Sequence, residues 1–144
     1  MSFYDPKIKG DALLYSRYMD DILRNIKRDI IDETLVKINS LHPALKFTVE
    51  REAENKSIAF LDMKILHVGN KLVSTWFTKS TDTGLIMNFY ALAPTNYKRS
   101  VVSGMVHRIF RACSTYETLH ESLQRAKINL RKNQYPDSFV DPIV

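Results

Sequence analysis

The sequence predicts an α+β fold in which a β-hairpin carrying YMDD, a helix and further antiparallel strands precede a basic pair of helices. Two observations lead to this class. Short strand-like runs separated by turn signals fill most of the first ninety positions. In the last third, apolar residues recur instead at the spacing of amphipathic helices. A chain of 144 residues, 44% of them hydrophobic, has room for one domain with a real core, or for part of a larger one.

The first predicted element is a hairpin around the stretch YSRYMDDIL. Residues 12–18 and 22–26 are strand-like, and the link Met19-Asp20-Asp21 puts two adjacent carboxylates at the tip. Asp is favoured in turns, which offers an ordinary explanation for the pair. The functional alternative is that a stiff tip aims two oxygen ligands at one Mg²⁺ ion, which would also offset the repulsion between them.

A helix is expected after residue 28. Asp29 can serve as its N-cap, and His42-Pro43 marks its end. The apolar residues of this stretch recur at i, i+4 and i+7, as Ile31, Leu35 and Ile38.

Extended segments are expected to follow this helix. Residues 46–50 alternate between apolar and polar side chains, and 58–66 and 72–78 read as strands. Gly69-Asn70 between the last two is typical of a hairpin turn. Residues 87–90 are a candidate for a further short strand.

The last third predicts two helices. From Asn96 onward, one arc at about 100° per residue is apolar and comprises Val102, Met105, Val106, Ile109, Phe110 and Cys113. The opposite arc comprises Ser100, His107, Arg108 and Arg111. Ser114-x-x-Glu117 has the pattern of a capping box that opens the second helix, and Gln134-Tyr135-Pro136 ends it. The apolar line of the second helix comprises Leu119, Leu123, Ala126 and Leu130.

The positive charge is concentrated in these helices. The whole chain has a net charge of +5, whereas residues 97–132 hold eight Lys or Arg and two Glu, a net of +6. A solvated helix face is one explanation, and a surface that faces phosphates is the other. The candidate phosphate contacts are Lys98, Arg108, Arg111, Arg125, Lys127 and Arg131. Six such contacts predict that affinity falls with salt with a log–log slope of about −5.

The sequence also excludes several classes. It has no apolar run near the roughly 20 residues that cross a membrane, and its first residues lack the apolar stretch of a signal peptide. A single cysteine, Cys113, allows neither an intrachain disulfide nor a cysteine-based zinc site. This composition suits a reducing intracellular setting.

Five motifs occur in order along the chain. They are Arg17-Tyr18-Met19-Asp20-Asp21; Leu41-His42-Pro43 followed by Lys46-Phe47-Thr48; Phe60-Leu61-Asp62; WFTKSTDT from Trp76; and Asn133-Gln134-Tyr135-Pro136. In this order and approximate spacing they resemble the reverse transcriptases of Penelope-like retroelements, where YxDD is the third motif of the polymerase palm. The resemblance covers nearly the whole chain.

The resemblance implies a role for the carboxylates and for their neighbours. Asp20 would be the principal ligand and Asp21 the second ligand of a catalytic Mg²⁺ or Mn²⁺ ion. Tyr18 and Met19 would lie near the end of the primer, and Lys46 would contact the incoming triphosphate. Trp76 and Lys79 would belong to the region that grips the primer. The expected partner is then an RNA or DNA template-primer.

The resemblance also implies a division of the chain. Residues 1–92 would be part of the palm, 93–136 a thumb-like or helix-turn-helix-like region, and 137–144 a tail. Polymerase chemistry needs a third carboxylate from an earlier palm strand, and only Asp5 and Asp11 precede the hairpin, neither in a strand-like run. We therefore expect a missing N-terminal segment to complete the palm, and the chain alone to be inactive and to hold Mg²⁺ weakly.

Three functional hypotheses result. The first is part of an RNA-directed DNA polymerase. The second is a non-catalytic nucleic-acid-binding remnant that uses the basic helices. The third is an interaction module in which the apolar arcs of the helices pack on a partner or on a second copy of the chain. The unpaired sheet edge that a partial palm would leave favours such an association.

Overall fold

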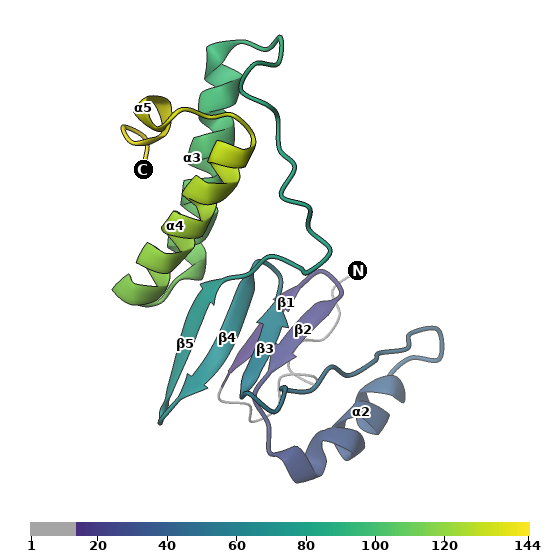
Figure 1. The fold of residues 1–144 in the computed structure, drawn as a ribbon. Helices are drawn as coiled ribbons and strands as arrows, with labels where there is room; N and C mark the ends of the chain where they lie inside the picture. The colour runs from purple at the N-terminus through teal and green to yellow at the C-terminus, as the bar shows by residue number, and fades with distance from the viewer. Residues whose placement is uncertain (1–13) are drawn as a thin grey trace. The chain divides into compact units, whose positions relative to one another are not determined.

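The computed structural model describes residues 14–144 and has an α+β architecture (Figure 1). Its described elements are β1 (Tyr15–Tyr18), β2 (Asp21–Arg24), the 3₁₀ turn η1 (Arg28–Ile30), α2 (Ile31–Asn39), β3 (Ser57–Phe60), β4 (Met63–Val68), β5 (Lys71–Trp76), α3 (Thr95–Ala112), α4 (Tyr116–Lys132) and α5 (Asp137–Val140). The strands form two small antiparallel sheets, β1-β2 and β3-β4-β5. Contacts divide the chain into two units, one ending at Arg51 and the other running from Glu52 to Val144.

The predicted YMDD hairpin is present in the first unit. Tyr18 pairs with Asp21, so the turn consists of Met19 and Asp20 only and Asp21 is the first residue of β2. The expected three-residue link is therefore wrong by one residue. Met19 has a φ of 51°, which lets an antiparallel pair close over two residues. The first two residues of the predicted strand 12–18 lie outside the described residues.

The predicted helix of this unit is α2, but its ends differ from the prediction. Asp29 lies in η1, and the N-cap is Ile30, whose side chain makes no capping hydrogen bond. The C-cap is Ser40, two residues before the expected end. The sequence signals placed the helix correctly and its boundaries only approximately, as is usual for helix termini.

The predicted strand 46–50 is not formed. Both backbone groups of Phe47 bond instead to the side-chain amide of Asn39: the Phe47 N–H donates to Oδ1 at 2.6 Å, and Nδ2 donates to the Phe47 carbonyl at 3.1 Å. An alternating pattern needs a neighbouring strand to become a sheet, and here a side chain takes the neighbour's place.

The sheet of the second unit contains one more hairpin than the sequence predicted. The segment 58–66 is not one strand but parts of β3 and β4, which turn at Leu61-Asp62 so that Phe60 pairs with Met63. Leu61 has a φ of 56° without being glycine or asparagine, so the turn lacked the usual sequence signal. The hairpin at Gly69-Asn70 is confirmed, with Val68 paired to Lys71.

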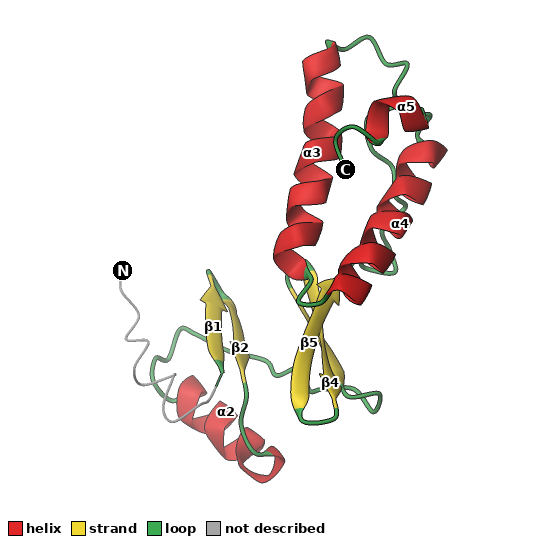
Figure 2. Cartoon of the chain, turned by 90° about the vertical axis from the view of Figure 1, so that its left-hand side faces the viewer, coloured by secondary structure: helices red, strands yellow, loops and turns green. Residues whose placement is uncertain are grey.

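The two C-terminal helices are confirmed, with a small shift at the link between them. The capping box that opens α4 is formed by Thr115 and Thr118 rather than by Ser114 and Glu117. Ser114 instead bonds to β5, because its N–H donates to the Ser74 carbonyl at 3.1 Å and its hydroxyl accepts from the Ser74 N–H at 2.9 Å. The helix link is thereby fixed to the edge of β5, and α3 and α4 diverge from this point toward α5 (Figure 2).

The end of α4 is fixed by a Schellman motif. Gln134 has a φ of 68°, its N–H donates to the Arg131 carbonyl, and the Tyr135 N–H donates to the Leu130 carbonyl at 3.0 Å. Tyr135 then enters the core with Leu130, Val102, Val106 and Val140. Residues 137–144, expected as a tail, contain α5, whose Val140 is buried.

The predicted strand 87–90 is a loop held by one buried side chain. The Asn133 amide donates to the Gly84 carbonyl at 2.9 Å and accepts from the Ile86 N–H at 3.2 Å. The Asn133 backbone carbonyl accepts from the Phe89 N–H at 3.0 Å. These bonds replace the strand ladder that the sequence suggested, and they tie the segment before α3 to the end of α4.

Candidate nucleic-acid interface

The two faces of α3 are as the sequence predicts, with one exception. Val102, Val106 and Ile109 are buried, and Ala112 joins them. The opposite face is exposed and comprises Ser100, His107, Arg108 and Arg111. Phe110, expected on the apolar arc, is 52% exposed because it lies at the margin of that arc, where α4 does not cover it.

The cations of α3 are not neutralised within the described residues. Lys98 Nζ lies 5.2 Å from the centre of the Phe89 ring, and the Arg99 guanidinium lies 5.8 Å from that of Phe139. Such stacking leaves the positive charge in place. Arg108 and Arg111 are exposed and make no side-chain hydrogen bond or ion pair in residues 14–144.

Three of the four cations of α4 have partners inside the protein, in contrast, and the fourth, Lys132, is exposed. Arg131 donates to both carboxylate oxygens of Asp137, at 2.7 and 3.0 Å, and Lys127 donates to Asp141 at 2.8 Å. Arg125 donates to the Trp76 carbonyl at 2.8 Å. Three candidate phosphate contacts therefore have partners inside the protein, which connect α4 to α5 and to β5.

The Arg131–Asp137 pair is expected to make the stability of the fold depend on pH. The hydrogen bond from Arg131 lowers the pKa of Asp137, and the charges of Arg131 and Lys127 act in the same direction. A carboxyl whose pKa is lower in the folded state stabilises the fold above its unfolded pKa of about 4, and this contribution is lost as the pH falls through the folded value.

We therefore expect the thermal midpoint of the parent to exceed that of Asp137→Asn at pH 7, and this difference to shrink below about pH 4. The effect is small because both side chains are about half exposed. Differential scanning calorimetry at pH 7 and pH 3 measures it. A difference of equal size at both pH values would contradict the assignment.

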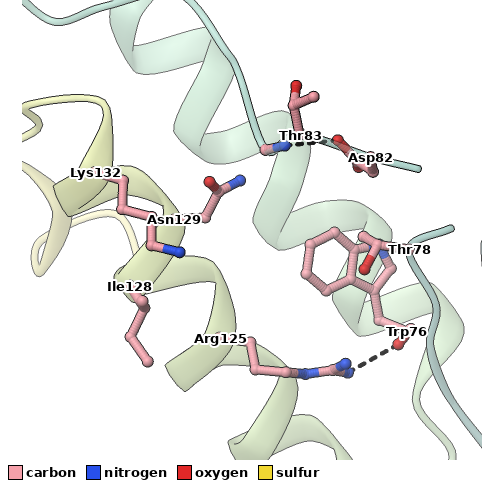
Figure 3. Close-up of a pocket in the computed structure, with 9 residues that line it drawn as sticks. Trp76, Thr78, Asp82, Thr83, Arg125, Ile128, Asn129 and Lys132 are labelled. Carbon is pink, nitrogen blue, oxygen red and sulfur yellow. Dashed lines mark hydrogen bonds between the residues drawn. The ribbon is translucent and has the colours of Figure 1, made fainter. Parts of the chain in front are cut away.

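A groove of about 280 Å³ lies between α4 and the chain that leaves β5 (Figure 3). Its lining includes Trp76, Arg125 and Lys132, together with Thr78 and Asp82. The structure thus brings together one expected primer contact, Trp76, and one expected phosphate contact, Arg125. The Arg125 guanidinium lies 5.8 Å from the centre of the Trp76 ring, so the two side chains form a cation–π contact with each other.

The remaining primer candidate of this unit is elsewhere. Lys79 is exposed in the loop after β5 and does not line the groove.

The other candidates lie in the first unit. Asp20 and Asp21 are exposed, and their carboxylates make no hydrogen bond or ion pair with the part of the chain described. Tyr18 and Met19 are exposed beside them, and Lys46 is exposed in the segment after α2. Within residues 14–144 no three His, Cys, Asp or Glu side chains gather into a possible metal site, so no third ligand from these residues lies beside the two aspartates.

Sequence reasoning missed three residues that shape this interface. Arg99 belongs to α3 and keeps its charge, but was not among the candidates. Asp137 and Asp141 neutralise two candidates on α4. The residues after Pro136 gave no helix signal, because α5 is only four residues long. The clue in the sequence was that two acidic residues follow directly after a basic helix.

Comparison with known families gives a match that includes the two C-terminal helices. Residues 85–144 match the animal helix-turn-helix domain. The match includes α3, α4 and α5 and excludes the YMDD hairpin. The helix pair joined by the short link at Ser114 is consistent with a helix-turn-helix domain. No curated protein and no solved structure shows a significant match to the chain. The helices of residues 14–144 include none with the length and apolar character needed to span a bilayer.

Proposed function

We propose that this protein binds nucleic acid through residues 85–144. The observation that carries the proposal is a coincidence of position: the stretch that matches the helix-turn-helix family also contains the segment with a net charge of +6. Helix-turn-helix domains dock a helix against the duplex, and basic side chains provide affinity by contacting phosphates.

Binding of the full 144-residue chain to labelled nucleic acids tests this proposal. We expect saturable binding to a DNA duplex in fluorescence anisotropy at about 50 mM salt, with a dissociation constant below about 10 µM. Double-stranded RNA and single strands of equal length show which form is preferred. Absence of binding to all three at protein concentrations of about 100 µM would contradict the proposal. Asp20→Asn should bind like the parent, because the hairpin lies outside the matched region.

A second candidate function is supported by a different observation. Asp20 and Asp21 are exposed at the end of a tight antiparallel hairpin, the setting of the YxDD box in reverse transcriptases. We propose on this basis that the chain includes the C-terminal part of an RNA-directed DNA polymerase. Asp20 and Asp21 could hold a Mg²⁺ ion, which would supply charge stabilisation for phosphoryl transfer when bound. Two ligands from adjacent residues bind such an ion weakly, so this proposal needs a further carboxylate beside them. Within residues 14–144 no third His, Cys, Asp or Glu side chain gathers with the pair.

Primer extension tests the second candidate. When an upstream palm segment is supplied, extension should require Mg²⁺ and should be abolished by Asp20→Asn. Asp62→Asn is a matched control, because Asp62 also occupies the second position of a two-residue turn whose first residue has positive φ. Extension by Asp20→Asn at the rate of the parent would reject the polymerase assignment.

A further inference from the structure

We propose that the first helix of the pair, α3, is the one that contacts the nucleic acid, and that its outward face takes the phosphates of a DNA duplex. This inference rests on the proposed function and deepens it. In familiar helix-turn-helix proteins the second helix enters the major groove, and the first crosses the backbone. The charges and contacts of this chain indicate the opposite assignment.

The net charge of the matched region resides on α3. Residues 85–144 contain eight basic and four acidic side chains. Four of the basic side chains and none of the acidic ones belong to α3. The rest of the region therefore has four of each and is neutral. A neutral surface offers a duplex little of the electrostatic attraction that dominates phosphate binding.

The side-chain contacts of α4 increase this difference in charge between the two helices. On α4, Lys127 and Arg131 are held by Asp141 and Asp137, and Arg125 is held by the carbonyl of Trp76. The outward side of α4 also carries Glu117 and Glu121, which would repel phosphates. These three cations of α4 thus stabilise the fold and are not available without breaking its contacts.

The outward face of α3 is open along its length. It runs from Tyr97 to Arg111, about 21 Å at the rise of an α-helix, and both of these residues are exposed. Midway along it, a Cβ on Gly104 would meet no atom within 4 Å. His107 and Arg108 continue the same exposed face. A helix of this kind fits the major groove of B-DNA, which is about 12 Å wide, and its unpaired arginines provide the charge complementarity.

A pair of double variants of the full chain tests the inference. R108Q/R111Q and K127Q/R131Q each remove two positive charges from the matched region, one pair from α3 and the other from α4. Affinity for a DNA duplex is measured by anisotropy from about 50 to about 300 mM salt. R108K/R111K keeps the charges and is the rescue control, and circular dichroism checks that each variant keeps its helices.

The expected results differ sharply between the variants. R108Q/R111Q should bind about 50-fold more weakly at 0.1 M salt, with a log–log slope smaller by about 2, and R108K/R111K should recover the affinity. K127Q/R131Q should bind within about threefold of the parent and unfold at a lower temperature, because Asp141 and Asp137 lose their partners.

Three results would overturn the inference. In the first, K127Q/R131Q loses as much affinity as R108Q/R111Q while keeping its helices. In the second, R108Q/R111Q binds like a parent that itself binds DNA. In the third, R108Q/R111Q loses binding to poly-glutamate but keeps binding to duplex DNA, which would assign this face to an acidic protein. A parent that binds no nucleic acid at all would instead reject the proposed function.

Discussion

Raising the salt concentration from about 50 to about 200 mM is expected to weaken duplex binding by about 100-fold. Each phosphate contact releases counterions, and log K falls with log salt with a slope of about −0.9 per contact. The four cations of α3 that form no ion pair within the described residues predict a slope of about −4. The six candidates taken from the sequence predicted about −5, because they included three cations of α4 that have partners inside the protein and left out Arg99.

The slope is obtained from anisotropy titrations at five or more salt concentrations, with a glutamate salt in place of chloride as a control for anion binding. A slope shallower than about −1 would mean that phosphate contacts do not provide the affinity, and the electrostatic account would be wrong.

Tyr135→Ala is expected to lower the free energy of unfolding by about 3–5 kcal/mol, the usual range for removing a buried aromatic ring. Tyr135 is 2% exposed, and its ring lies 5.3 Å from that of Phe89 and 6.2 Å from that of Phe139. It joins three segments of the second unit: the loop before α3, the end of α4 and α5. Urea unfolding followed by circular dichroism at 222 nm measures the loss.

Tyr135→Phe separates the ring from its hydroxyl. The hydroxyl oxygen is buried and has no hydrogen-bond partner among residues 14–144, and burial raises its pKa. Replacing it should therefore leave the stability unchanged or raise it by about 1 kcal/mol. If Tyr135→Phe were as unstable as Tyr135→Ala, the hydroxyl rather than the ring would hold these segments together.

The C-terminal helices were predictable because their signals are local and long. Apolar residues at helical spacing identified α3 and α4, and a terminal Tyr-Pro pair marked where the second helix stops. The strands were less predictable, because pairing depends on partners distant in sequence. The apolar run 58–66 hid a turn at Leu61-Asp62, and the alternating run 46–50 found Asn39 instead of a strand.

The two hairpin turns also bear on the interpretation of YMDD. Met19-Asp20 and Leu61-Asp62 are both two-residue turns in which an apolar residue with positive φ precedes an aspartate. Asp20 therefore has a counterpart in Asp62, whereas Asp21, the first residue of β2, has none, since Met63 occupies the equivalent position. The distinctive feature of the YMDD hairpin is thus its second carboxylate.

The candidate interface was predictable as a region but not by residue. Sequence alone located the basic segment and the exposed face of α3 correctly. It could not separate free cations from paired ones, because the partner Asp137 begins, and the partner Asp141 caps, a helix with too few residues for a periodic signal. Which of several like charges is free is decided by tertiary contacts.

Mapping the contact surface on the full chain tests the central claim most directly. Backbone amide spectra of the ¹⁵N-labelled protein are recorded with and without a short DNA duplex at low salt. We predict that the largest chemical-shift changes lie on α3 between Tyr97 and Arg111, with small changes on the outward side of α4 and at Met19–Asp21. Shifts confined to the outward side of α4, or to the hairpin, would contradict the account.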